Sequence, residues 1–123
     1  MKTYNFDSLS IDIELKELLG VKIEIIHFRG RIGNQNSYQV AEEMMTHLDS
    51  SIPNIIIGLK QLEYINSQGL AFLLSLIRRV EGLNGRFIIG GVNQMIETII
   101  QLVEVSDQVV IVSSIDDALS LWK

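Results

Sequence analysis

The strongest constraint on the fold is an alternation between short β-branched runs and amphipathic segments of helical period. The run 55–57, Ile-Ile-Ile, precedes the first of these segments, and runs 86–89 and 109–112 precede the next two. Parallel strands need long crossover connections, which are most often helices. The alternation therefore predicts an α/β fold with a largely parallel sheet and right-handed crossovers. The helix expected after run 55–57 has the apolar stripe Leu70, Leu73, Leu74, Ile77 and Val80. The helix expected after run 86–89 has the stripe Ile96, Ile99, Ile100 and Val103.

The region before these units has the period of β-structure. Segment 10–17 alternates apolar and polar residues, and segment 21–28 begins in the same way and becomes richer in β-branched residues. The turn Leu19-Gly20 between them favours an antiparallel hairpin. We therefore expect an α/β single domain over residues 1–123, with a mixed, mostly parallel sheet of four to five strands and about four helices.

Glycine, asparagine and serine mark the expected ends of elements. We interpret segment 30–33 and the pair Gly90-Gly91 as turns, and segment 61–65 as the approach to the turn 66–69. The residues 83–85, Leu-Asn-Gly, are expected to end the second helix, since Asn and Gly tolerate a left-handed terminus. The expected N-caps are Asn36 or Ser37, Asn66 or Ser67, Asn93 and Ser114.

Composition excludes several classes of function. The sequence has 123 residues, no cysteine and a net charge of −5, and its basic residues are scattered. Nucleic-acid binding needs clustered Lys and Arg, so a protein partner is the better expectation. Disulfides and thiolate metal sites are excluded. No basic and apolar leader or membrane-length apolar run is present, and we expect a cytoplasmic protein.

No catalytic constellation is visible. The glycines match neither a phosphate loop nor a dinucleotide fingerprint, and His27 and His47 lack the spacing of paired metal ligands. Adjacent carboxylates on a helix diverge by about 100°, so the pairs 42–43 and 116–117 do not form an acid/base site. We therefore expect a protein that is not an enzyme and that uses neither a cofactor nor a metal.

Four segments in order resemble a STAS domain, the module of bacterial anti-sigma factor antagonists and of sulfate-transporter tails. FRGRIG at 28–33 stands where the family typically reads Gly-x-Leu/Ile-Asp. NIIIGLKQLEYINSQGLAFLLSL at 54–76 stands where it has an apolar strand, Asp-Ser-Ser/Thr-Gly-Leu and an apolar helix. RFIIGGVNQMIETIIQLV at 86–103 and SIDDAL at 114–119 match the later strand, helix and terminal segment.

The resemblance implies a switch between protein partners. In phosphorylatable antagonists of the family, a kinase that is also the anti-sigma factor modifies the serine after the aspartate, and the matching residue is Ser67. The unmodified protein would bind this kinase-type anti-sigma factor. A phosphatase would return the phosphorylated protein to the unmodified form. The implied partner-binding residues are Gly33, Asn34, Asn66, Ser67, Gln68 and Gly69.

The sequence departs from the family pattern at acidic positions. Gly33, Gly58 and Asn66 stand where carboxylates are usual, and we expect each change to remove negative charge near Ser67. Gln68 removes a second hydroxyl. These departures favour a second hypothesis, a STAS structural subunit of a signalling scaffold or a lipid-transport ABC complex that is not phosphorylated. A nucleotide-binding enzyme is a third alternative, which the missing phosphate loop disfavours.

Overall fold

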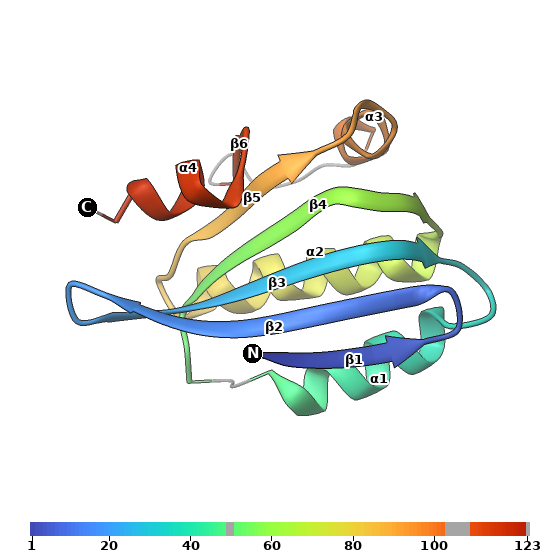
Figure 1. Cartoon of the computed structure of the whole chain (residues 1–123), viewed down its shortest axis with the longest axis horizontal. Helices are drawn as coiled ribbons and strands as arrows, with labels where there is room; N and C mark the ends of the chain where they lie inside the picture. The colour runs from blue at the N-terminus through green and yellow to red at the C-terminus, as the bar shows by residue number, and fades with distance from the viewer. Residues whose placement is uncertain (49–50, 103–108, 123) are drawn as a thin grey trace.

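The computed structural model describes residues 1–48, 51–102 and 109–122. Its elements are arranged as in Figure 1. The strands are β1 (Lys2–Phe6), β2 (Leu9–Leu18), β3 (Val21–Ile32), β4 (Asn54–Ile65), β5 (Phe87–Val92) and β6 (Val110–Val112). The helices are α1 (Ser37–His47), α2 (Ser67–Gly82), α3 (Gln94–Gln101) and α4 (Ile115–Ser120).

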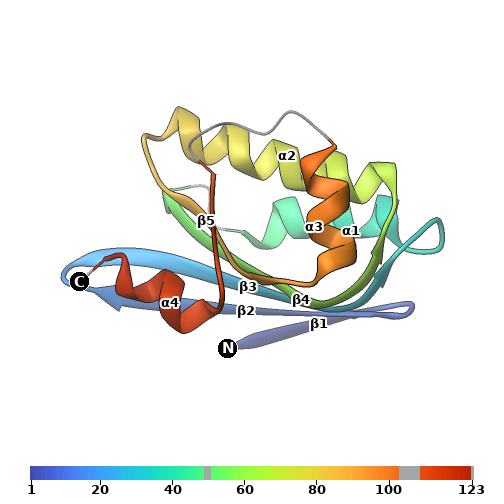
Figure 2. The same ribbon diagram turned by 90° about the horizontal axis from the view of Figure 1, so that it is seen from above.

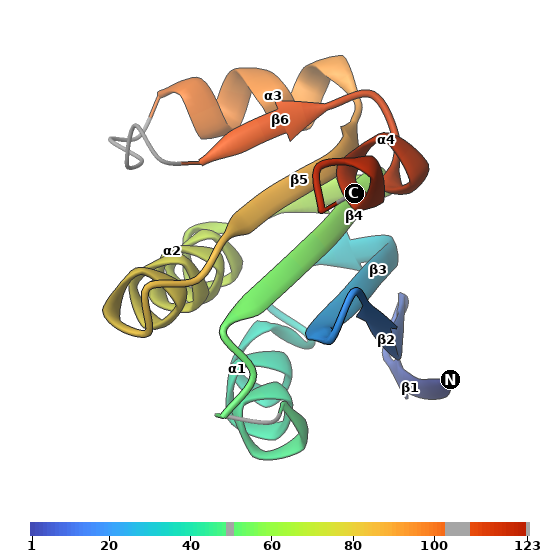
Figure 3. The same cartoon turned by 90° about the vertical axis from the view of Figure 1, so that its left-hand side faces the viewer.

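All six strands form one mixed sheet in which spatial order follows chain order, β1-β2-β3-β4-β5-β6. The pairs β1–β2 and β2–β3 are antiparallel, whereas the pairs β3–β4, β4–β5 and β5–β6 are parallel. Figure 3 shows this order running from β1 near the N-terminus to β6 at the opposite edge of the sheet. The predicted hairpin is confirmed, with Ser10 opposite Arg29 and Glu17 opposite Lys22.

Helices cover the two faces of the sheet unequally (Figure 2). The larger core packs α1, α2 and α3 against one face, and the smaller core packs α4 against the other. Successive strand residues point to opposite faces. Accordingly, Ile55 and Ile57 belong to the larger core and Ile56 to the smaller one. A continuous apolar run is thus explained by burial on both faces.

The prediction of four to five strands missed β1, with which the sheet has six strands. Tyr4 and Phe6 alternate with polar residues in this strand and pack against the larger core. Both are only partly buried. This edge strand adds two aromatic rings to the core, and the first hairpin turn follows it directly.

Two predicted turns belong to strands. Residues 30–32 of the predicted turn 30–33 belong to β3, which ends at Ile32, and Gly90-Gly91 lies inside β5. The second error arises because the connection to α4 crosses β5 closely. A Cβ added at Gly90 would lie 2.9 Å from Ile115 Cα, so glycine is required here for packing and not for a turn.

The helix ends agree with several expectations. Asn93 Oδ1 accepts from Ile96 N, and Ser114 Oγ accepts from Asp117 N. Helix α2 ends at Gly82, and Asn84 has a positive φ of 57° just beyond it. Val103, which we assigned to the stripe of the third helix, lies outside the described residues.

Candidate functional site

The candidate site begins where β4 ends and α2 starts. Asn66 is the N-cap of α2, because its Oδ1 accepts from Gly69 N at 2.9 Å and its carbonyl accepts from Leu70 N at 3.0 Å. Asn66 N donates to Ile32 O at 2.9 Å. Ser67 is the first helical residue, so the interpretation of its hydroxyl as the cap is wrong. The longer amide of Asn66 already reaches Gly69 N.

This capping leaves Ser67 exposed at a helix N-terminus. Within the described residues, the Ser67 hydroxyl makes no side-chain hydrogen bond. The first amides of a helix have no partner within the helix. Here the amides of Asn66 and Gly69 are bonded, which leaves those of Ser67 and Gln68 to face other groups. The first turn of α2 contains no acidic residue. Uncompensated amides and the helix dipole favour an anion here.

A set of neutral side chains, which we call the amide cluster, joins the starts of α1 and α2. It consists of Asn34, Ser37, Asn66 and Gln68. Asn66 Nδ2 donates to Asn34 Oδ1 at 3.2 Å and to Ser37 Oγ at 3.1 Å. The Ser37 hydroxyl donates to Gln68 Oε1 at 2.5 Å. Ser37 is only 1% exposed. The cluster therefore fixes the β4–α2 junction against the β3–α1 loop.

The β3–α1 loop is itself held by a buried asparagine. Asn36 Oδ1 accepts from Gly33 N at 3.1 Å, and Asn36 Nδ2 donates to Arg31 O at 2.8 Å and to Asp7 O. Asn36 is at the backbone N-cap position of α1, but its side chain makes no cap hydrogen bond. Its amide instead joins the loop to the turn between β1 and β2.

The predicted partner-binding residues come together at this end of the sheet. Gly33 and Asn34 lie on the β3–α1 loop, and the rest lie at the start of α2. Gly69 is buried, and a Cβ added there would lie 2.7 Å from Ile32 Cγ2 and 2.8 Å from Ile65 Cγ1. Gly69 therefore lets the helix pack closely on the strand ends and presents no side chain. We call these six residues the Ser67 surface: Gly33, Asn34, Asn66, Ser67, Gln68 and Gly69.

Gly58 does not belong to this surface, which corrects our placement of it. It lies inside β4 in register with His27, and a Cβ added there would meet His27 Cδ2 at 3.0 Å and Ile115 Cδ1 at 3.1 Å. These residues lie on the α4 side of the sheet. The missing carboxylate at this position therefore affects packing beside His27 and not the charge around Ser67.

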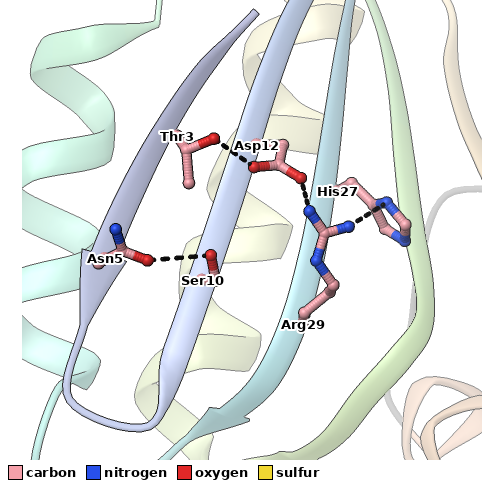
Figure 4. Close-up of polar contacts among 6 residues, drawn as sticks. All are labelled: Thr3, Asn5, Ser10, Asp12, His27 and Arg29. Atoms are coloured by element: carbon pink, nitrogen blue, oxygen red, sulfur yellow. Dashed lines mark hydrogen bonds and ion pairs between the residues drawn. The ribbon is translucent and has the colours of Figure 1, made fainter.

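A second polar group, which we call the charged cluster, lies on the sheet face opposite α1 and α2 (Figure 4). It consists of Thr3, Asp12, His27 and Arg29. The Asp12 carboxylate accepts from Thr3 Oγ1 at 2.7 Å and forms an ion pair with Arg29. The Arg29 guanidinium also lies 3.4 Å from His27 Nδ1. Burial lowers the pKa of His27 below its usual range. The cluster connects three neighbouring strands.

The comparisons with known proteins agree with this architecture. The STAS domain family model matches residues 12–118. The chain belongs to the STAS domain family. No curated protein matches the sequence. Within the described residues, no helix is long and apolar enough to cross a membrane, and no cluster of His, Asp and Glu could hold a metal ion.

Solved structures share the STAS fold at low sequence identity. A candidate anti-sigma factor antagonist from Thermotoga maritima is 15% identical with a TM-score of 0.70, covering 89% of this chain and 93% of its own. An anti-sigma-factor antagonist (STAS) domain protein from Planctomyces limnophilus is 17% identical with a TM-score of 0.68, covering 90% and 97%. Phosphorylated SpoIIAA, a Bacillus cell fate determinant, is 17% identical with a TM-score of 0.66, covering 91% and 100%.

Several residues of this STAS domain that shape the site escaped the sequence reasoning. Ser37 was considered only as a helix cap, although it bridges both helix starts. Arg31 and Tyr64 were not considered, yet they are Cα partners on β3 and β4 beside the Ser67 surface. The Arg31 guanidinium lies 5.1 Å from the centre of the Tyr64 ring. An exposed aromatic residue at the end of an apolar strand was the available signal.

Proposed function

We propose that this STAS protein is an anti-sigma factor antagonist that binds a kinase-type anti-sigma factor through the Ser67 surface and is switched by phosphorylation of Ser67. The observation that carries the proposal is the exposed Ser67 hydroxyl at the first position of α2, with Asn66 performing the capping. The hydroxyl is therefore not needed to hold the helix. A residue free of a structural task is suited to covalent modification.

The local electrostatics suit a switch that leaves the fold intact. A phosphate adds about −1.5 to −2 charges at pH 7 and three acceptor oxygens. The amides of Ser67 and Gln68 and the α2 dipole stabilise that charge within the domain. A partner that packs on the Ser67 surface must instead desolvate the phosphate, which disfavours the complex. The likeness to phosphorylated SpoIIAA supports the view that this fold accommodates the modification.

The expected partners follow from this scheme. The unmodified protein binds the kinase-type anti-sigma factor, and a phosphatase returns phosphorylated protein to the binding state. The protein acts as a cytoplasmic binding module and not as an enzyme. Its net charge of −5 supports protein partners over nucleic acid.

Phosphopeptide mass spectrometry over residues 64–78, on protein from its native cells in growth and in stress, tests the modification. We expect a phosphate on Ser67 whose occupancy changes with the condition. Ser67→Asp should weaken binding of the purified kinase-type partner by at least about tenfold, as loss of a desolvated contact does. The matched control is Ser113→Asp, because Ser113 is also exposed near a helix start. Equal binding by Ser67→Asp and wild type rejects the switch.

The neutral amide cluster favours a second candidate, a structural STAS subunit of a scaffold or lipid-transport complex. Asn66 replaces a carboxylate that a kinase could bind, and its amide is committed to Asn34 and Ser37. Charge-assisted hydrogen bonds are about twice as strong as neutral ones. Asn66→Asp should therefore raise the rate of Ser67 phosphorylation if the first function holds. A stable complex with a permease and its ATPase that is insensitive to Ser67→Ala indicates the second.

A further inference from the structure

A cleft of about 490 Å³ adjoins the Ser67 surface, and most of its lining residues have no role in the function proposed above. Its walls are the β1–β2 turn, the β3–α1 loop and the end of β4. Figure 1 shows these segments and the start of α2 at the same end of the molecule. Gly33 and Asn34 belong to both sites, because both line the cleft and both are part of the Ser67 surface, where Asn34 bonds to Asn66. A partner on the Ser67 surface is therefore within reach of the cleft.

The wall formed by the first turn is rigidly attached. Arg31 N donates to Ser8 O at 2.8 Å, and Asn36 Nδ2 donates to Asp7 O. Gly30 has a φ of 115°, and a Cβ there would lie 2.2 Å from Ser8 O. Only glycine permits this close approach of the two backbones. The cleft is therefore built into the fold and does not depend on the position of a loose loop.

This wall lies outside the segment that defines the family. The STAS model matches residues 12–118, whereas β1 and the turn at Asp7 and Ser8 precede residue 12. The cleft thus combines a wall from outside the matched segment with two walls from inside it. The family match alone therefore does not predict the wall that precedes residue 12.

The cleft is lined by side chains of opposite charge, Arg31 and Asp7. Arg31 is exposed and lies over the Tyr64 ring, which is itself 41% exposed. In the β1–β2 turn, Ser8 Oγ donates to the Asp7 carboxylate at 3.2 Å. Among the described residues, neither Arg31 nor Asp7 forms an ion pair. The Tyr64 ring holds the Arg31 guanidinium by a cation–π contact, and the N–H groups of the guanidinium remain available to bind an acceptor.

We propose that the cleft receives one acidic side chain of the protein partner, bound by Arg31 against Tyr64. This inference rests on the proposed partner-binding function and adds the chemistry of a second contact. Arg and Tyr are enriched among residues that dominate binding, and guanidinium binds carboxylate in a bidentate manner. Asp7 disfavours a second carboxylate. Partner selection thus depends on Arg31, a cation that lies close to Gly33 and Asn66, where the family usually carries carboxylates.

A partner-free test uses a short peptide with one central glutamate among serines and glycines, and its glutamine twin. At low salt we expect the Glu peptide to shift the NMR signals of Arg31 Nε–H and the Tyr64 ring, with the Gln twin about fivefold weaker. Arg31→Gln should abolish the Tyr64 shifts, and Asp7→Asn should strengthen them about twofold. Arg78→Gln, an exposed arginine on α2, should change nothing. Equal shifts from both peptides, or no shifts up to the solubility of the peptide, overturn the proposal.

The purified kinase-type partner separates this proposal from the proposed function. Arg31→Glu should weaken its binding by at least about tenfold, and the loss should shrink as salt is raised. If Ser67→Asp weakens partner binding and Arg31→Glu does not, the proposed role of the cleft is overturned and the proposed function stands. If Arg31→Glu weakens partner binding and Ser67→Asp does not, the proposed role of the cleft is supported and the phosphorylation switch is rejected. Circular dichroism of each variant confirms that the exposed substitutions leave the fold intact.

Discussion

The amide cluster and the charged cluster both tie separate elements together, but they do so with different chemistry. In the charged cluster, Asp12 is 6% exposed and is bonded to a neighbouring hydroxyl and guanidinium. In the amide cluster every member is neutral, and the exposed Ser67 beside it makes no side-chain hydrogen bond within the part of the chain that the structure describes. A buried charge is costly unless paired, whereas neutral groups tolerate change at their edge. The charged cluster thus joins neighbouring strands, whereas the neutral cluster adjoins the surface proposed for recognition.

Removal of Arg29 should produce the largest loss of stability. The Asp12 carboxylate would remain buried without its cation, so Arg29→Ala should lower the free energy of unfolding by about 3 kcal/mol. Asp12→Ala should cost less, about 2 kcal/mol, because the Arg29 side chain is 42% exposed and is solvated without its partner. Urea denaturation measures both, with Arg78→Ala as a control that changes little. A larger loss for Asp12→Ala contradicts the assignment of the buried charge as the critical group.

Gly69→Ala should have the next largest effect and should act on both stability and binding. The added methyl would meet the side chains of Ile32 and Ile65, and such overpacking costs about 2 kcal/mol. Because α2 must shift away from the strand ends, partner binding should weaken as well. Gly82→Ala is the matched control, since its Cβ would meet no atom within 4 Å. Full stability of Gly69→Ala would show that close packing does not position the site.

Asn66 distinguishes capping from the other hydrogen bonds of the amide cluster. Asn66→Ala loses the acceptor of Gly69 N and should cost about 1 kcal/mol. Asn66→Asp keeps that acceptor and gains from the helix dipole, but loses the donors to Asn34 and Ser37. Thermal denaturation should therefore place Asn66→Asp between wild type and Asn66→Ala. If both variants are equally unstable, the donors and not the cap hold the junction.

His27 should give the charged cluster a small pH dependence. Burial lowers its pKa in the folded state, so the unfolded chain binds more protons between the two pKa values. Its contribution is fully present above pH 6.5, the unfolded value, and is lost as the pH falls towards the folded value. The wild type should thus lose more stability than His27→Gln between pH 7.5 and 5.5. Equal losses in urea titrations mean that burial of His27 does not affect folding.

The sequence pattern was sufficient for the elements whose burial is periodic. The hairpin, the four helices and the buried central strands follow from apolar spacing. Errors arose where tertiary contacts decide. Strand β1 was missed because its inward residues are just two aromatics. The pair Gly90-Gly91 was interpreted as a turn, but it is glycine because the connection to α4 crosses β5. Gly58 was placed near Ser67, but β4 continues to Ile65, so Gly58 lies inside the strand and faces His27. A local pattern carries no information on such crossings.

Six residues of the candidate site were named from the sequence, but neither their internal roles nor the neighbouring Arg31 and Tyr64 were. The resemblance to STAS domains pointed to the β3–α1 loop and the start of α2, and the structure brings these segments together at one end of the sheet. The exchange of roles between Asn66 and Ser67, the bridging position of Ser37 and the Arg31–Tyr64 pair depend on side-chain reach in three dimensions. Adjacent cap candidates such as Asn66 and Ser67 are equivalent until the strand end is fixed.

The contact between Gly30 and Ser8 also provides a marker that can be read in other sequences. No residue with a Cβ fits at position 30 while the first turn keeps its place. A relative with alanine or a larger residue there must have moved or lost that turn, and with it one wall of the cleft. Glycine at this position, together with an N-terminal strand and a cation at the next residue, therefore identifies the homologues in which partner choice could have evolved along the same route.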